Sequence, residues 1–330
     1  MMPVITFGEA LVDMLSSRLG TGPDAKADAA TTAAREVFTP YAGGAPANVA
    51  VACARLGVPS RFLGMLGDDH FGDFLAAELD AHGVDTSGVV RTDAARTALA
   101  FVSRDAHGER TFDFYRPPAA DLLYRLAHLP AGVFADPAIV HFCSNSLTEP
   151  EIAETTLAMA EMARRAGCLV SVDANLRHNL WPGNSADISL VTRLLDAADL
   201  LKLATDELDD LRADHPREGW LAERFANGVK VAVITDGPGE VWLNGVGLDE
   251  RITPPRVQAV DTTAGGDAFI GGLLAELANY PAMPQAEWHR DTAFLRHAVT
   301  LACRCGAHAV TRPGAYAALP DRHDLAGFKG

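Results

Sequence analysis

The feature that most constrains the fold is the alternation, along most of the chain, of short apolar runs with longer segments of helical spacing. Runs typical of buried strands occupy residues 4–8, 61–66, 138–143, 168–173, 199–203 and 230–235. Helical segments rich in Ala and Leu occupy residues 46–56, 71–82, 150–166 and 205–213. Because parallel strands need crossover connections, this order predicts an α/β fold with a mostly parallel central sheet between two layers of helices.

Two regions break the alternation. Residues 16–40 are rich in Ala, Thr, Asp and Gly with little periodicity, whereas residues 97–116 contain two alternating runs around the turn-like DAHGE. The second pattern predicts a β-hairpin. Together the two regions predict a small β element that stands off the main sheet.

The charge and the cysteine content of the chain limit which partners and which cellular location are expected. The chain carries 43 acidic and 28 basic residues, a formal charge of −15, which argues against nucleic-acid and anionic-membrane partners because nothing offsets repulsion from phosphates. The first residues lack a basic leader, and no apolar stretch reaches membrane-spanning length. The five cysteines are odd in number and lie mostly in apolar segments, which favours reduced thiols and a cytoplasmic protein. Helical spacing turns Cys303 and Cys305 apart, so no metal site is expected there.

The stretch DTTAGGDAFIGGLL, residues 261–274, places more small residues before a helix than capping requires. If the helix begins here, the amides of Ala264, Gly265 and Gly266 converge at the positive end of its dipole and form a cradle for an anion. Asp267 would then lie beside the anion, where a carboxylate can accept a proton from an attacking hydroxyl. The alternative is an acid that only complements the helix dipole.

Other phosphate-binding motifs are missing. The chain has neither a G-x-x-x-x-G-K-[ST] motif, nor a G-x-G-x-x-G after a strand, nor the protein-kinase set. A second glycine cluster, in YAGGAPANVAVACARLG, places Gly43 and Gly44 before Asn48 at a helix start. It is either a tight turn or a backbone edge that lies against a polyol, with the Asn48 amide hydrogen-bonded to hydroxyl groups.

Polar residues follow several of the predicted strands. In open parallel sheets, ligands bind outside the carboxyl ends of the strands, so these side chains are expected to gather at one edge. They are Asp13, Asp173, Asn175, Arg177, Glu207, Thr235 and Gly237.

The two glycine-rich stretches together resemble the paired motifs of the PfkB, or ribokinase-like, carbohydrate kinases. Further blocks resemble fructokinases in particular, among them GEALVDM at 8–14, GMLGDDHFGDFL at 64–75 and DANLRHNLWP at 173–182. The resemblance covers nearly the whole chain. It implies a single ribokinase-like domain over residues 1–330, with a three-layer fold and a small β lid from about 11–40 and 95–118.

The resemblance also implies roles for individual residues. Ala264, Gly265 and Gly266 would hold the transferred phosphoryl group, with Asp267 as the base and Arg177 supplying local positive charge. For Arg177, a solvated loop position is the alternative. Residues expected to contact the sugar are Asp13, Gly43, Gly44, Asn48, Phe101, Arg116 and Asn175. Those expected to border the nucleotide are Thr235, Gly237 and Gly239.

Ion sites follow from the same resemblance. In the family, an N-x-x-E motif is associated with magnesium, and it corresponds here to residues 204–207. Ala204 stands in place of the Asn, so only Glu207 is expected to act on Mg²⁺, through a water molecule. An exposed helix acid is the alternative. Asp261 and Thr263, with a C-terminal loop at 306–315, are expected to hold K⁺, unless Asp261 is a simple cap.

The expected reaction is phosphorylation of D-fructose by ATP to fructose 6-phosphate. The nearest alternative is a kinase for 2-keto-3-deoxygluconate or a related sugar acid, whose carboxylate Arg116 and Arg177 could bind. A sugar-binding protein without catalysis is the alternative of another class. Phe101, Phe112 and Phe114 of the lid could also pair with a second subunit, which predicts a homodimer.

Overall fold

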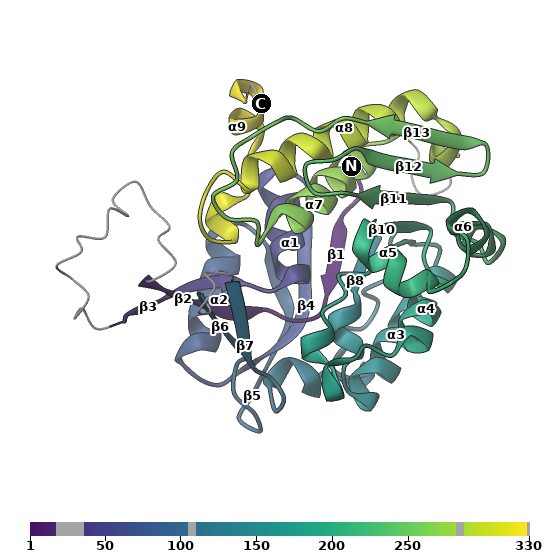
Figure 1. The fold of residues 1–330 in the computed structure, drawn as a ribbon. Helices are drawn as coiled ribbons and strands as arrows, with labels where there is room; N and C mark the ends of the chain where they lie inside the picture. Colours follow the sequence, from purple (N-terminus) through teal and green to yellow (C-terminus); the bar gives the residue numbers. More distant parts are fainter. Residues whose placement is uncertain (18–35, 105–109, 282–286, 329–330) are drawn as a thin grey trace.

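The computed structural model describes residues 1–17, 36–104, 110–281 and 287–328. Its main sheet has nine strands in the order β13-β12-β11-β10-β9-β8-β1-β4-β5 (Figure 1). Every neighbouring pair is parallel except β11 with β12 and β12 with β13. The strands are β1 Val4–Phe7, β4 Ser60–Gly67, β5 Asp85–Thr92, β8 Ile139–Cys143, β9 Leu169–Asp173, β10 Leu200–Ala204, β11 Val231–Thr235, β12 Val241–Gly245 and β13 Leu248–Ile252.

Helices cover both faces of this sheet, which confirms the three layers (Figure 1). One layer holds α1 Ala45–Arg55, α2 His70–Ala81, α7 Gly265–Ala278, α8 Thr292–Ala309 and the short α9 Arg322–Gly327. The other holds α3 Pro150–Arg165, α4 Ile188–Leu195, α5 Thr205–Arg212 and α6 Arg217–Ala226. All six predicted strands and all four predicted helices are present within one or two residues of their expected ends.

Two separate apolar cores explain why the strands are apolar at successive positions rather than at alternate ones. Val4 packs in the core under α1 and α7, and its neighbour Ile5 packs in the core under α3 and α4. Val233 and Ile234 of β11 divide in the same way. Side chains alternate between the two faces of a strand, so a strand covered by helices on both faces must be apolar throughout.

A second sheet of four strands stands beside the first, in the order β3-β2-β6-β7 (Figure 1). It is formed by β2 Leu11–Ser16, β3 Phe38–Gly43, β6 Leu99–Arg104 and β7 Arg110–Tyr115. β6 and β7 are antiparallel, which confirms the hairpin at 97–116. Residues 18–35, part of the region assigned to the lid, lie outside the described residues.

The chain order around β1 locates the functional edge of the main sheet. β1 lies between β4 and β8, so the connections that leave these strands diverge to opposite sides. Such a reversal in strand order opens a crevice at the carboxyl ends of the strands. Residues that directly follow β1, β8 and β9 therefore meet there.

Among the described residues, no helix is both long and apolar enough to cross a membrane. All five cysteines are free and buried.

A close helix contact under the site gives a stability prediction. A Cβ added at Gly271 of α7 would overlap the Cβ of Ala52 in α1, whereas one added at Gly219 of α6 would meet nothing within 4 Å. We expect Gly271→Ala to lower the free energy of unfolding by about 1–3 kcal/mol because overpacking outweighs the gain in helix propensity. Gly219→Ala should raise it by up to about 1 kcal/mol. Urea denaturation measures both, and equal shifts in the two variants would contradict the packing argument.

Candidate active site

The helices of this fold differ in how their first turns are capped. α2, α4 and α8 begin at Asp69, Asp187 and Asp291, whose side chains accept backbone N–H bonds of the first turn. α1 and α7 begin at Gly44 and Ala264, and neither has a side-chain cap. α3 and α6 also lack a side-chain cap, so what distinguishes α1 and α7 is that their uncapped starts are the two glycine clusters of the sequence and border one cavity.

At the start of α7, the first helical bond runs from the Ala268 amide to the Ala264 carbonyl, at 2.9 Å. Earlier amides therefore have no acceptor within the helix. The sequence predicted three free amides, but the Gly265 amide is not free. Because of the turn before the helix, it donates a long hydrogen bond of 3.3 Å to the Thr262 carbonyl. The cradle thus relies mainly on the amides of Ala264 and Gly266.

A cavity of about 390 Å³, here called the polar cavity, lies at the carboxyl edge of the sheet. Most of the residues predicted for the sugar and for catalysis line it, although they come from distant parts of the sequence. They are Asp13, Gly44, Asn48, Arg116, Asn175, Arg177 and Asp267; Thr263, predicted to hold K⁺, also lines the cavity. The structure therefore brings the two glycine clusters and the residues that follow β1 and β9 to one place.

The double glycine is needed for close approach. A Cβ added at Gly43 would collide with the carboxylate of Asp13 on the neighbouring strand. Gly44 has a φ of 102°, and a Cβ there would lie 2.6 Å from the Glu9 carbonyl oxygen. Gly43 itself does not line the polar cavity but gives Asp13 the room to do so.

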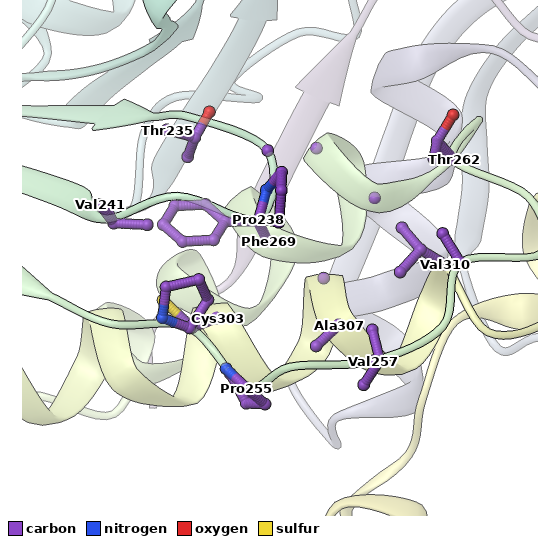
Figure 2. Close-up of a pocket in the computed structure, with 16 residues that line it drawn as sticks. Thr235, Pro238, Val241, Pro255, Val257, Thr262, Phe269, Cys303, Ala307 and Val310 are labelled. Atoms are coloured by element: carbon purple, nitrogen blue, oxygen red, sulfur yellow. The ribbon is translucent and has the colours of Figure 1, made fainter. Parts of the chain in front are cut away.

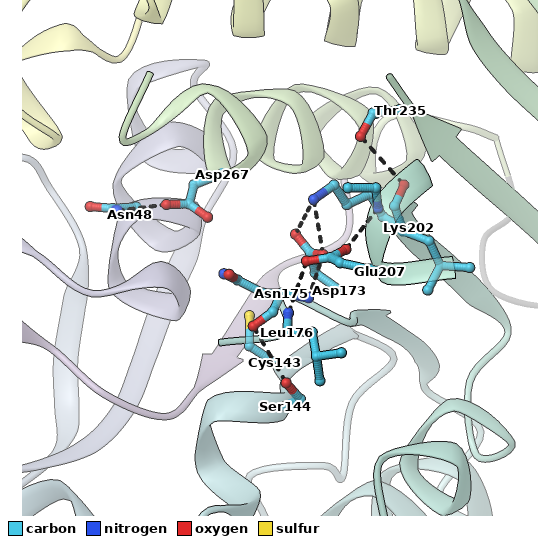
Figure 3. A network of polar contacts seen from close by, with 12 residues as sticks. Asn48, Cys143, Ser144, Asp173, Asn175, Leu176, Lys202, Glu207, Thr235 and Asp267 are labelled. Carbon is cyan, nitrogen blue, oxygen red and sulfur yellow. Dashed lines mark hydrogen bonds and ion pairs between the residues drawn. The ribbon is translucent and has the colours of Figure 1, made fainter. Parts of the chain in front are cut away.

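Asp267 lies in the first turn of α7 and is buried, with only 7% of its surface exposed. Asn48 Nδ2 donates a hydrogen bond of 2.7 Å to its Oδ2, as Figure 3 shows. Burial raises the pKa of Asp267 above its usual value, while the Asn48 bond and the charges of Lys202 and Arg177 oppose that shift. The result is a carboxylate held in a fixed direction and a better proton acceptor than one in water.

Asp13 is the second buried acid of the polar cavity. Burial, together with the nearby charges of Asp261 and Asp267, raises the pKa of Asp13 to about 7. Its ionised form is therefore maintained only near or above neutral pH.

Lys202 is a buried cation that the sequence did not single out. Its Nζ lies 3.0 Å from Asp173 in a nearly buried ion pair, and it is 3.2 Å from the position of a Cβ added at Gly266 (Figure 3). Burial disfavours the ammonium group, but the charges of Asp173, Glu207 and Asp267 outweigh that cost and raise the pKa of Lys202. The sequence feature that could have indicated this residue is a lysine within the apolar run DLLKL, near the carboxyl end of the strand. It places positive charge beside the cradle.

Glu207 lies in the same network and is buried, unlike an exposed helix acid. Its Oε1 accepts the Leu176 amide at 2.8 Å, and its Oε2 accepts the Ala204 amide at 2.7 Å (Figure 3). It therefore caps α5 and holds the loop after β9, which carries Asn175 and Arg177.

Arg116 and Phe101, both predicted to contact the sugar, have different surroundings. Arg116 lines the polar cavity, but its guanidinium pairs with Asp121 at 2.7 Å and donates to the Asn145 carbonyl at 2.9 Å. Phe101 contacts the ring of Phe38 edge to face and that of Tyr115 at a tilt, and it does not line the cavity. Phe114 lines it instead. The side chain of Phe112 lies outside the described part of the structure.

A second cavity of about 420 Å³, here called the apolar cavity, also borders the start of α7 (Figure 2). Thr235, Gly237, Gly265 and Gly266 line it, together with apolar side chains such as Phe269. Gly239 does not, because it lies within the turn whose Asp236 carbonyl accepts its amide at 2.7 Å. Since Asp267 lines the polar cavity, the first turn of α7 separates the two spaces.

Asp261 joins the start of this segment to the C-terminal loop. Its Oδ1 accepts bonds from the amide and the hydroxyl of Thr263, and its Oδ2 accepts the Gly314 amide at 3.1 Å. Asp261 therefore closes a turn with Thr263 ahead of α7 and contacts the C-terminal loop, but it does not cap the helix.

Comparisons with known proteins agree with this arrangement. The model of the pfkB family carbohydrate kinases matches residues 4–322. Fructokinase-1 of Oryza sativa subsp. japonica is 37% identical over 318 residues, which are 96% of this chain and 94% of that protein. A fructokinase from Xylella fastidiosa, solved with bound ATP, superposes with a TM-score of 0.90 at 40% identity and covers 98% of this chain and 97% of its own.

A third relative is a fructokinase from Vibrio cholerae O395, in fructose, ADP and calcium ion bound form, with a TM-score of 0.85 and 32% identity over 99% of both chains. A double mutant of that protein, in fructose, ADP and potassium ion bound form, has a TM-score of 0.86 at 32% identity and covers 99% of this chain and 98% of its own. Matched along nearly its whole length by the family model and by these relatives, this chain belongs to the PfkB family of carbohydrate kinases.

Proposed function

We propose that this carbohydrate kinase transfers the γ-phosphoryl group of ATP to the 6-hydroxyl of D-fructose, giving ADP and fructose 6-phosphate. The observation that carries the proposal is the position of Asp267 and the α7 amides between a polar cavity and an apolar one. The relatives solved with fructose, ADP or ATP support the same pair of substrates.

In this mechanism Asp267 accepts the hydroxyl proton while the sugar oxygen forms its bond to the γ-phosphorus and the bond to the ADP oxygen breaks. Ala264 and Gly266 amides hold the transferred group, and Arg177 and Lys202 offset the charge that it carries. Asp13, Asn48 and Asn175 orient the sugar, with Gly43 and Gly44 giving it access to the backbone. These groups are fixed before substrate binds, so positioning supplies much of the rate.

The apolar cavity suits the base of the nucleotide, with Thr235 and Gly237 beside the phosphate end. Few polar groups line it apart from these, so shape selects the base more than hydrogen bonding does. Cys303, which lines the cavity, is a contact for the base rather than for the phosphates.

Two ions complete the proposed site. Glu207 keeps a lone pair on each carboxylate oxygen beside its backbone bonds, enough to hold a water molecule of a Mg²⁺ shell. Mg²⁺, when bound, neutralises charge on the ATP phosphates. Asp261 and Thr263 with the loop at 306–315 are the proposed K⁺ site, in line with the potassium-bound relative.

The small sheet is the proposed lid, which would exclude water from the reacting phosphate. Its described surface exposes Tyr115 and, just before β3, Val37. Such apolar side chains favour a homodimer formed through this sheet.

An ADP-release assay across D-fructose, D-ribose and 2-keto-3-deoxygluconate tests the substrate. We expect turnover on fructose to exceed that on the other two. Turnover on the sugar acid with none on fructose would replace the proposal with the sugar-acid kinase, and no turnover with intact sugar binding would favour a non-catalytic sensor.

Asp267→Asn tests the proposed base. Because Asn keeps the shape but accepts no proton, we expect kcat to fall by roughly 10²–10⁴-fold while the fructose Kd changes less than about threefold. Glu276→Gln, on the same helix but lining neither cavity, should leave kcat within about twofold and serves as the control. An Asp267→Asn enzyme with normal kcat would exclude this role.

Asp13 gives a pH dependence of sugar binding. As pH falls below about 7, Asp13 becomes protonated and loses its capacity as a double acceptor, so fructose affinity should fall by up to about tenfold per pH unit. Calorimetric titration of the enzyme with fructose between pH 5.5 and 8.5 measures this. Asp13→Asn should bind weakly at every pH, and a wild-type Kd that stays constant over the range would contradict the assignment.

A further inference from the structure

Arg116 and Arg177 are the two arginines that line the polar cavity and that a substrate carboxylate could meet, and Arg116 is the buried one. It is 5% exposed, and its Nε and Nη2 lie 2.8 and 2.7 Å from the same oxygen of Asp121, which is also 5% exposed. Nη2 also donates to the Asn145 carbonyl, at 2.9 Å. Most N–H donors of this buried guanidinium are therefore already hydrogen-bonded, and its positive charge is already balanced by Asp121.

The wall beside Arg116 offers acceptors instead. Glu9 and Asn145 both line the polar cavity, and they are 2% and 4% exposed. Asn145 Nδ2 donates to Glu9 Oε1 at 3.0 Å, which fixes the carboxylate and leaves Glu9 Oε2 without a partner among the described residues. Asn145 Oδ1 and Asn48 Oδ1, in the same cavity, are likewise unpartnered there.

Buried acceptors without donors cost free energy until a ligand supplies the donors. Hydroxyl groups can supply them, whereas a carboxylate at neutral pH brings only more acceptors and a negative charge. Burial raises the pKa of Glu9 and the charge of Arg116 opposes that rise, whereas for Asp13 the charges of Asp261 and Asp267 add to the effect of burial. Glu9 therefore belongs to a different part of the cavity wall from the Asp13 and Asp267 pair.

We propose that this wall selects neutral polyhydroxyl substrates over sugar acids: Glu9 accepts a hydrogen bond from a sugar hydroxyl, and Asp121 keeps Arg116 from pairing with a substrate carboxylate. The inference rests on the proposed function, because it takes the ligand of the polar cavity to be the sugar. It assigns to Glu9 a direct sugar contact and to Asp121 a positioning role that acts through Arg116.

Charge-neutral variants test the selection. For wild type, Glu9→Gln, Asp121→Asn and the double variant, kcat/KM is measured with ATP on D-fructose and on 2-keto-3-deoxygluconate. We expect the preference for fructose over the acid to fall about tenfold or more in the double variant, which restores a net positive charge to the wall, and by less in each single variant. Glu9→Gln alone should raise the fructose KM several-fold and leave the ATP KM within about twofold.

The control is Asp196→Asn, which removes a carboxylate 2.8 Å from the buried Arg224 and lines neither cavity. It reports what the loss of a partly buried ion pair does to the fold alone, and its preference should match that of the wild type. If the double variant does not fold, Glu9→Asp, which keeps the charge but withdraws the acceptor, should still raise the fructose KM and should lower the preference less than Glu9→Gln does.

An unchanged preference in the folded double variant, or an unchanged fructose KM in both Glu9 variants, would overturn the inference while leaving the kinase proposal intact. Wild-type enzyme that does not phosphorylate fructose would instead refute the proposed substrate. The selection is then measured with whichever neutral sugar is turned over, against the same sugar acid.

Discussion

The arrangement of this molecule depends on the buried carboxylate of Asp267 at the uncapped start of α7. An isolated charge in such a place costs several kcal/mol. Here the positive end of the helix, the Asn48 amide and the charges of Lys202 and Arg177 offset that cost, while burial still raises the pKa of Asp267. The Asn48 amide, which opposes that rise in pKa, also fixes the direction of the carboxylate in the polar cavity.

The same constraint explains how a chain with a net charge of −15 can hold a polyphosphate. Positive potential is concentrated in a small volume: helix amides at the start of α7, Arg177 on the loop after β9, and Lys202 beneath Gly266. Lys202 stays charged because Asp173 and Glu207 surround it, and Glu207 in turn holds the loop that carries Arg177. Binding of phosphate and positioning of the substrate are therefore coupled through one buried network.

The features that could be predicted from the sequence are those set by local patterns of residues. The order of strands and helices, the hairpin, and the start of α7 with Asp267 follow from periodicity and from glycines at defined places, and they were confirmed. Strands β5, β12 and β13 were missed because their side chains are partly exposed, so these segments lack the continuous apolar runs of the other strands. Lys202 was missed because a lone lysine in an apolar strand gives no sign of the carboxylate it meets. The pairing of Glu9 with Asn145 joins residues 136 positions apart, and the Gly265 amide bond depends on a turn, so only coordinates disclose them.

The most direct measurement of the central claim is a crystal structure of the protein with D-fructose, ADP, Mg²⁺ and aluminium fluoride, a planar mimic of the phosphoryl group in flight. The account predicts fluoride ligands within hydrogen-bond distance of the Ala264 and Gly266 amides, and an oxygen of Asp267 in contact with the sugar hydroxyl that faces the aluminium. Aluminium fluoride bound away from the start of α7, or a hydroxyl approached by another base, would contradict it.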